Sequence, residues 1–191
     1  SGTRVWIDFG HFSICTSSCR GAFDSTEAVL AQQGYTVSEQ NTFPGHLSIP
    51  SDVKVLVLVT PAVAFTGSEV TTLKQFAQHG GRIVFVGGNS TSYGFFTSVE
   101  NNLLASLGSG MKNTSGSFAC SSELPGTSLR ATAVTVGVQS LSVGCSGSLT
   151  SGSNDFIFLY DATNTHALAG VAAVNTSSLN VSSKFGPVIK K

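Results

Sequence analysis

Short apolar runs recur through the first half of the chain and predict buried strands. Residues 52–60 are almost continuously apolar and β-branched, which is typical of a parallel strand covered on both faces. Residues 4–9 and 82–86 follow the same pattern. Residues 35–39 instead alternate between apolar and polar positions, as an edge strand does. The pattern therefore predicts a mainly parallel sheet.

Amphipathic segments follow these runs and predict helices over residues 24–34, 66–80 and 98–107. Thr66 or Ser68 is expected to cap the second helix, because Thr and Ser are residue types that cap helices. Since strand and helix alternate at this spacing, residues 1–108 are expected to form parallel βαβ units. The fold class predicted from the pattern is α/β, with a doubly wound sheet.

The pattern changes in the second half of the chain. Residues 109–176 are rich in Ser, Gly and Thr, with short alternating runs such as 131–138. Residues 155–160 and 166–174 predict the two strands of a hairpin. We therefore expect a β-rich extension that packs on the first sheet or lengthens it, followed by a peripheral tail over 177–191.

Charged residues are few, and this limits the classes of molecule that the chain is expected to bind. Charged residues make up 10% of the chain, and 10 Lys+Arg balance 10 Asp+Glu. Binding to nucleic acid needs clustered cations, which this sequence lacks, so nucleic acid is excluded. A neutral, hydroxyl-rich surface repels its own copies weakly. The expected partners are copies of the chain, other extracellular proteins or glycans.

Four cysteines, Cys15, Cys19, Cys120 and Cys145, fit two disulfides in an oxidising compartment. Three pairings are possible. We favour Cys15–Cys19, which is local, and Cys120–Cys145, which brackets one β-rich segment. The competing interpretation is a zinc site, but the short paired spacings of structural zinc sites are not present. No metal or cofactor is expected.

Other sequence features also suggest a secreted or cell-surface glycoprotein. Asn-x-Ser/Thr sequons occur at Asn89, Asn113, Asn175 and Asn180. No apolar run reaches the roughly 18 residues that predict a membrane span. No signal peptide is visible, so a secreted protein would be present here in its mature form.

Several motifs of the first half together resemble a known family. Residues 8–11 (DFGH) end a strand in an Asp-x-x-His-like turn, and residues 34–37 (GYTV) follow a helix. Residues 52–89 then give a strand, a loop with Pro, a helix ending in Gly-Gly and a strand reading RIVFVG. Over roughly residues 4–108 the chain resembles the class I glutamine amidotransferase-like fold, in its ThuA-type and gliding-motility-type branches. The resemblance implies a flavodoxin-like arrangement of the sheet.

The resemblance also bears on activity. Catalytic members of that family carry a cysteine on a sharp strand–turn–helix elbow, G-x-C-x-G. No cysteine of this chain stands in such a context. The chain therefore resembles the non-catalytic branch, and glutamine amidotransferase activity is not expected.

One candidate nucleophile is Ser90, which follows a predicted buried strand where a serine elbow would lie. His166 and Asp161 would complete a triad with it on paper, although nothing in their spacing requires this. The alternative interpretation of Ser90 is a polar loop at the carboxyl edge of the sheet.

A second candidate site is the end of the first strand. Ligands of open α/β sheets bind outside the carboxyl ends of the strands, where Asp8 and His11 are expected. His11 could act as a general base that Asp8 orients. The structural interpretation is that Asp8 caps loop amides while His11 packs on Phe9 or Phe12.

The chain has 13 Phe, more than one core needs, so some are expected at the surface. Tyr93, Phe95 and Phe96 are the candidates, since exposed aromatic rings suit stacking on sugars or burial between subunits. We therefore expect a non-catalytic extracellular interaction or structural module that binds glycan or protein, or self-assembles on a surface layer or filament. The alternative is a secreted hydrolase that uses Ser90 or the Asp8/His11 site.

Overall fold

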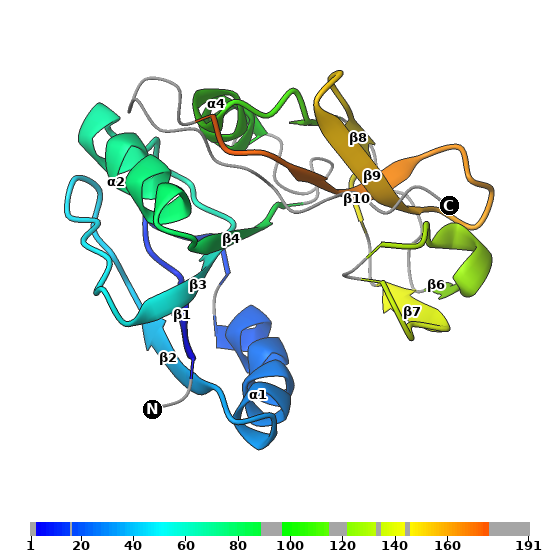
Figure 1. The fold of residues 1–191 in the computed structure, drawn as a ribbon, viewed down its shortest axis with the longest axis horizontal. Helices are drawn as coiled ribbons and strands as arrows, with labels where there is room; N and C mark the ends of the chain where they lie inside the picture. Colours follow the sequence, from blue (N-terminus) through cyan, green and yellow to red (C-terminus); the bar gives the residue numbers. More distant parts are fainter. Residues whose placement is uncertain are drawn as a thin grey trace.

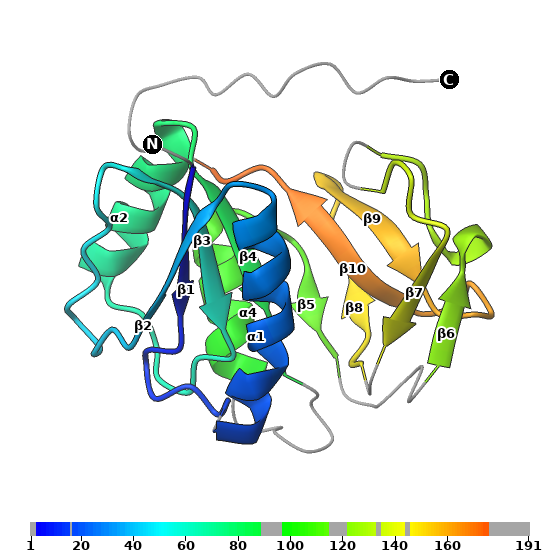
Figure 2. The same cartoon turned by 90° about the horizontal axis from the view of Figure 1, so that it is seen from below.

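The computed structural model has a parallel sheet flanked by helices at one end and antiparallel strands at the other (Figures 1 and 2). The structure describes residues 3–15, 17–88, 97–114, 122–132, 135–143 and 146–175. None of the helices in these ranges has the length and apolar character that a membrane crossing requires.

Four parallel strands form the first sheet in the order β2-β1-β3-β4. They are β1 (Arg4–Asp8), β2 (Thr36–Gln40), β3 (Val53–Val59) and β4 (Arg82–Val86). Val5 lies opposite Val37 on one side and opposite Val55 on the other. The four strands predicted from apolar runs are confirmed, and β2 lies at an edge, as its alternation indicated.

Helices lie on both faces of this sheet (Figure 1). They are α1 (Ser17–Gln32) on one face, and α2 (Gly67–Gln78) and α4 (Thr97–Leu107) on the other. The core beneath α2 and α4 includes Trp6, Leu56 and Leu73, and a second core on the α1 side includes Ile7 and Phe9. The sheet is therefore held by two separate apolar layers.

The predicted start of the first helix was wrong. α1 begins at Ser17 rather than at Asp24, so Asp24 lies inside the helix. Polar and small residues occupy its first turns, and their spacing gave no helical signal. Ends of the later helices were predicted more closely: Thr66, one of the two candidate caps, is the N-cap of α2, and Gly108 follows α4 with a positive φ of 92°.

Strands in the second half form two antiparallel sheets of their own. One has the order β5-β8-β10-β9, with β5 (Lys112–Asn113), β8 (Leu149–Thr150), β9 (Asp155–Tyr160) and β10 (Ala167–Ala172). The other pairs β6 (Ser122–Pro125) with β7 (Ser140–Val143), and the short helix η2 (Gly126–Ser128) follows β6. The predicted hairpin is confirmed as β9 and β10, whereas residues 135–137 of the run 131–138 form a turn.

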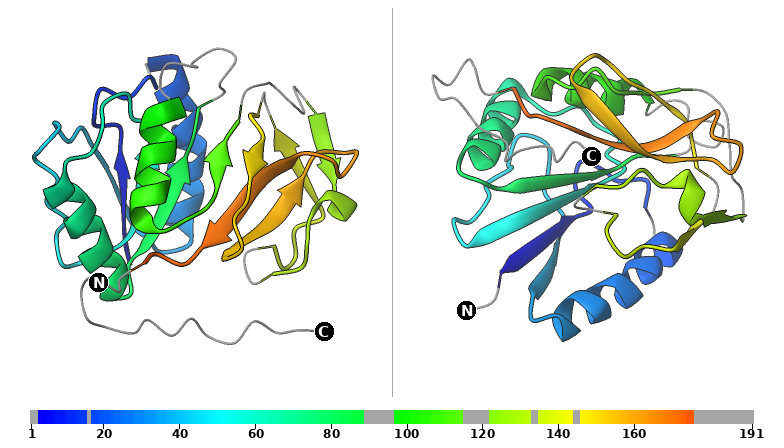
Figure 3. Two further views of the ribbon diagram at one scale, coloured as in Figure 1. Left: turned by 90° about the horizontal axis from the view of Figure 1, so that it is seen from above. Right: turned by 45° about the vertical axis from the view of Figure 1, so that its right-hand side comes forward.

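Burial of β3 and β4 differs between their two faces. Leu56 and Leu58 are buried beneath the helices of one face, but on the other face Val55 and Val57 are only half-buried and Val84 is 46% exposed. The prediction that these strands are covered on both faces was therefore wrong. The physical reason is that α1 is the one described helix on that side, and its width covers only part of the four strands (Figure 3).

Candidate functional site

Asp8 anchors the loop at the carboxyl end of β1. Its side chain is 2% exposed, and its Oδ1 accepts hydrogen bonds from the backbone N–H groups of Gly10 and Thr42, both at 2.9 Å. Gly10 must be glycine here, because a Cβ at this position would lie 2.3 Å from the Thr42 carbonyl oxygen. Asp8 therefore ties the loop after β1 to the loop after β2, which is the structural role that the sequence suggested.

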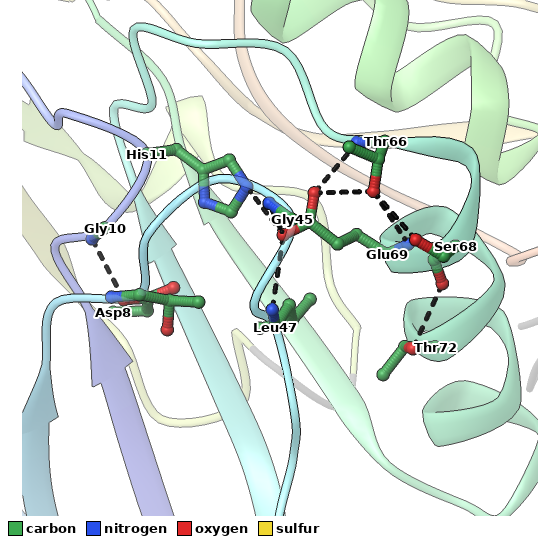
Figure 4. Close-up of polar contacts among 10 residues, drawn as sticks. Asp8, Gly10, His11, Gly45, Leu47, Thr66, Ser68, Glu69 and Thr72 are labelled. Carbon is green, nitrogen blue, oxygen red and sulfur yellow. Dashed lines mark hydrogen bonds and ion pairs between the residues drawn. The ribbon is translucent and has the colours of Figure 1, made fainter.

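Glu69 is the centre of a second buried network, shown in Figure 4. It occupies the third position of α2 and forms a capping box with Thr66, whose N–H and hydroxyl donate to its Oε2 at 2.8 and 2.9 Å. Its Oε1 accepts from the N–H groups of Gly45 and Leu47 at 2.8 and 3.3 Å, and it lies 3.1 Å from Nε2 of His11. One 2%-exposed carboxylate thus joins three segments of the chain.

This arrangement keeps Glu69 ionised. Burial alone would raise the pKa of the carboxyl, but the hydrogen bonds from Thr66 and His11 hold it below its usual value. Three donors reach Oε1 and two reach Oε2, which fills the sites that a carboxylate offers. Donors from the protein itself therefore occupy both oxygens of the Glu69 carboxylate.

His11 pairs with Glu69 and not with Asp8, which corrects the sequence-based assignment. Its ring stacks on Phe65, with centroids 3.8 Å apart, rather than on Phe9 or Phe12. Because a carboxylate oxygen only accepts, Nε2 carries the proton that is donated to Glu69. Nδ1 is buried and has no partner among the described residues, and the whole residue is 1% exposed.

Backbone geometry around His11 is unusual and is held by neighbouring hydrogen bonds. His11 and Phe12 both have φ of 52°, and Thr60, at the end of β3, has φ of 38°. The N–H groups of Ala62 and Val63 both donate to the His11 carbonyl at 3.0 Å. Such conformations persist only where the surroundings determine them, so this loop has a defined shape.

The anchored loops carry two exposed aromatic rings. Phe12 is 64% exposed and Phe43 is 67% exposed. They form an edge-to-face pair with centroids 6.5 Å apart and an interplanar angle of 75°. Sequence reasoning missed Phe43 and considered Phe12 only as packing for His11. It also missed Glu69, although Thr66 followed three residues later by Glu is a capping-box signal.

The predicted pairing of Cys15 with Cys19 is present as a disulfide in the structure. Cys19 lies in α1, so the bridge links the first turn of the helix to Cys15, which comes just before the helix. Cys15 is 6% exposed and packs in the core beside Phe9. The bridge therefore fixes the start of α1 against the sheet.

Glu100, in the first turn of α4, is a second buried carboxyl at the same edge of the sheet. Its Oε1 accepts from the N–H of Gly88 at 2.7 Å, and its Oε2 accepts from Nδ2 of Asn113 at 2.9 Å. Burial raises the pKa of this carboxyl, and the bonds from Asn113 and Gly88 offset only part of that effect. Because Nδ2 of Asn113 is buried in these contacts, the expectation of a glycan on Asn113 does not fit this fold.

Asp161 and His166 do lie together, in the turn between β9 and β10. Nδ1 of His166 lies 2.8 Å from Asp161 Oδ2, and the backbone of Thr165 and His166 donates to Asp161 Oδ1. Burial would raise the pKa of Asp161, but these bonds, led by that of His166, hold it far below its usual value. The pair therefore stabilises the turn.

Of the other predicted site residues, the structure describes some and not others. Asn175, the first residue of its sequon, is exposed. No group of three or more His, Cys, Asp or Glu that could hold a metal ion occurs within the described ranges. Several predicted residues lie outside those ranges: Ser90, Tyr93, Phe95, Phe96, Cys120, Cys145, Asn89 and Asn180.

Comparisons with known proteins give a likeness of fold. No family model matches the chain, and no curated protein matches it. Among solved structures, the chain is similar to the mmIFT52 N-terminal domain, with a TM-score of 0.60 and 14% sequence identity over 82% of this chain and 72% of that one. At this identity the likeness shows a shared α/β fold and leaves function to be argued from the site itself.

Proposed function

We propose that the chain is a non-catalytic extracellular interaction module, and that its binding edge is formed by the loops after β1 and β2. The observation that carries the proposal is the Phe12–Phe43 pair. Both rings are largely exposed, and they lie on loops whose backbone N–H groups donate to the buried carboxylates of Asp8 and Glu69. Exposed aromatic pairs on rigid loops are typical of recognition surfaces, because their apolar area is available without an ordering cost.

The same geometry argues against catalysis by Asp8 and His11. A general base must come within hydrogen-bond reach of a substrate proton. His11 is 1% exposed beneath Phe65, its Nε2 is engaged by Glu69, and Asp8 is not its partner. We therefore assign both side chains to holding the loops in place.

We propose a protein as the partner, rather than a glycan. Sugar sites combine an aromatic ring with polar side chains that bind the hydroxyl groups. Asp8 and Glu69, the carboxylates that anchor these loops, are each 2% exposed and cannot reach a bound sugar. Two apolar rings at an angle suit an aliphatic or aromatic side chain of a partner protein.

The extracellular location is proposed on two observations. The Cys15–Cys19 disulfide suits an oxidising compartment. Asn175 is exposed and lies in a sequon.

The finer fold assignment is also a proposal. We propose a doubly wound, amidotransferase-like core over residues 1–108, a β-rich extension over 109–176 and a peripheral tail over 177–191. It is supported by the strand order β2-β1-β3-β4 and by helices on both faces of the sheet.

The proposal is tested by placing a photo-crosslinking phenylalanine analogue at position 12 in the producing cells, with the same analogue at Val136 as the control. Val136 is 80% exposed and lies in the β-rich half. A protein captured at position 12 is then purified and titrated against Phe12→Ala, Phe43→Ala and Val136→Ala. We expect about thirtyfold weaker binding for each Phe variant, and unchanged binding for Val136→Ala.

Two results would overturn the proposal. Glycan-array binding that disappears in Phe12→Ala and Phe43→Ala would replace the protein partner by a glycan. Covalent labelling of Ser90 by a fluorophosphonate, with hydrolytic activity that Ser90→Ala removes, would replace the binding module by the secreted hydrolase.

A further inference from the structure

An apolar groove runs along the incompletely covered face of the parallel sheet. Its volume is about 380 Å³. Its floor is formed by residues of β3 and β4 and its wall by residues of α1, chiefly Val55, Val57, Val84, Val86, Phe23 and Leu30. None of the residues lining it is charged. This groove is a different surface from the Phe12–Phe43 pair, which lies beyond the ends of the strands.

On the opposite face of the sheet, the position that corresponds to the groove is filled by a second helix. There, two helices lie side by side and bury Leu73 of α2 and Leu103 of α4 against the strands. The groove face has α1 alone among the described helices (Figures 1 and 3). Because a sheet buries its apolar face against another layer, the groove corresponds to the position of one further helix.

The outward face of α1 has the properties that this position requires. Ala22, Ser25 and Val29 point away from the sheet at helical spacing, and all are exposed, Val29 by 56%. Gly21 and Ala28 belong to the same face, which contains no charged residue. A neutral face of small side chains can approach a floor of valines closely.

The length of α1 and the net charge of the chain also fit an α1 helix from a second copy in the groove. A 16-residue helix such as α1 is about 24 Å long, and a seven-residue strand such as β3 is about 23 Å long. A formal net charge of zero means that two copies do not repel each other. Each copy offers both the helix and the groove, so a two-fold arrangement makes the same contact twice.

We propose that two copies of this chain associate through this face, with α1 of each copy seated in the groove of the other. The two α1 helices then lie in one layer between two parallel sheets. Two contacts of this length bury on the order of 1,000 Å², which is what a specific interface needs.

The test is sedimentation velocity of the full chain across a range of concentrations, with Val29→Lys and Val84→Lys as variants and Val136→Lys as the matched control. Each substitution occurs twice in a two-fold interface, so each interface variant should weaken association about a hundredfold. Val136→Lys should associate like the unchanged chain. Val29 lies on an exposed helix face, so Val29→Lys tests the proposal even if Val84→Lys fails to fold.

Hydrogen exchange separates the possible occupants of the groove. A second copy predicts that protection of residues 82–86 rises with protein concentration and is lost in Val29→Lys. A chain that stays monomeric at every concentration overturns the proposal. So does protection that is independent of concentration and disappears when residues 176–191 are deleted, because the tail would then cover the groove.

Discussion

Two buried glutamates at the same edge of the sheet respond to burial in opposite ways. Glu69 and Glu100 each lie in the first turn of a helix that follows a strand, and they are 2% and 1% exposed. The pKa of Glu69 is lowered, whereas that of Glu100 is raised. Their positions within the helices and their exposed fractions are nearly the same, but the Glu100 carboxyl lies deeper in the protein and loses more hydration.

The number and kind of donors account for the rest of the difference. Glu69 accepts from three segments, including an imidazole N–H of His11, whereas the described donors to Glu100 are the Gly88 amide and the Asn113 side chain. Hydrogen bonds to a charged carboxylate replace the water that burial removes, and too few of them leave the charged form unfavourable. Glu69 is therefore a structural anion, whereas the charged form of Glu100 is disfavoured by burial.

Glu69→Gln is expected to give the largest effect. The substitution removes the charge and turns an amide N–H₂ toward groups that already donate, so the free energy of unfolding should fall by about 3 kcal/mol. Urea denaturation at neutral pH measures it. Glu123→Gln, at an exposed carboxylate bonded to Ser140, is the control and should change stability by less than about 0.5 kcal/mol. A loss below about 1 kcal/mol for Glu69→Gln would contradict the role of Glu69 as anchor.

The pH dependence of stability distinguishes the two carboxyls next. Glu100 has a raised pKa, so it lowers stability above its usual pKa of 4.5, and stability rises as the pH falls through its folded-state pKa. Glu69 has a lowered pKa, so its contribution is present above 4.5 and is lost as the pH falls below that value. The unchanged chain should therefore be most stable at mildly acidic pH.

The midpoint of urea unfolding, measured at a series of acidic pH values, checks this pH profile of stability. Glu100→Gln should show a smaller rise in stability between neutral pH and about 4.5, because Glu100 no longer titrates while Glu27, whose pKa burial and Glu39 also raise, remains. It should keep the fall below that pH. Equal profiles for Glu100→Gln and the unchanged chain would show that the two glutamates do not differ as described.

At neutral pH, Glu100→Gln is expected to have the smallest effect. The amide keeps an acceptor oxygen for the Gly88 N–H and removes a charge that burial disfavours, which offsets the loss of the bond from Nδ2 of Asn113. The free energy of unfolding should stay within about 1 kcal/mol of the unchanged value, or rise. Thermal unfolding of the two single variants and of the double variant gives the comparison. A loss as large as that of Glu69→Gln would mean that both carboxylates anchor loops.

The sequence predicted the elements of the first half well, for a local reason. The strand patterns of residues 52–60 and 82–86 and the cap at Thr66 depend on neighbours within a few positions. α1 was placed too late because Ser17 and its neighbours carry no periodic apolar signal. The packing of Cys15 against the sheet core, which helps to place this start, is a tertiary contact.

The candidate site was predicted only in part. Asp8 and His11 were expected at the end of β1, and they are there. The partner of His11 was assigned wrongly, since Glu69 is 58 residues away along the chain. No spacing within a single segment indicates that the loop carrying Phe43 will reach the same place.

The sequence by itself indicated the four strands of the first sheet, a cap of α2 at Thr66 or Ser68 and the favoured pairing of Cys15 with Cys19, because these depend on contacts between near neighbours. Only the tertiary structure decided which donors reach Glu69 and which reach Glu100, since those donors come from segments far apart in the chain. It likewise decided that Val84 and Val55 remain accessible. Alternation shows which side chains share a face of a sheet, but coverage of that face depends on where α1 packs.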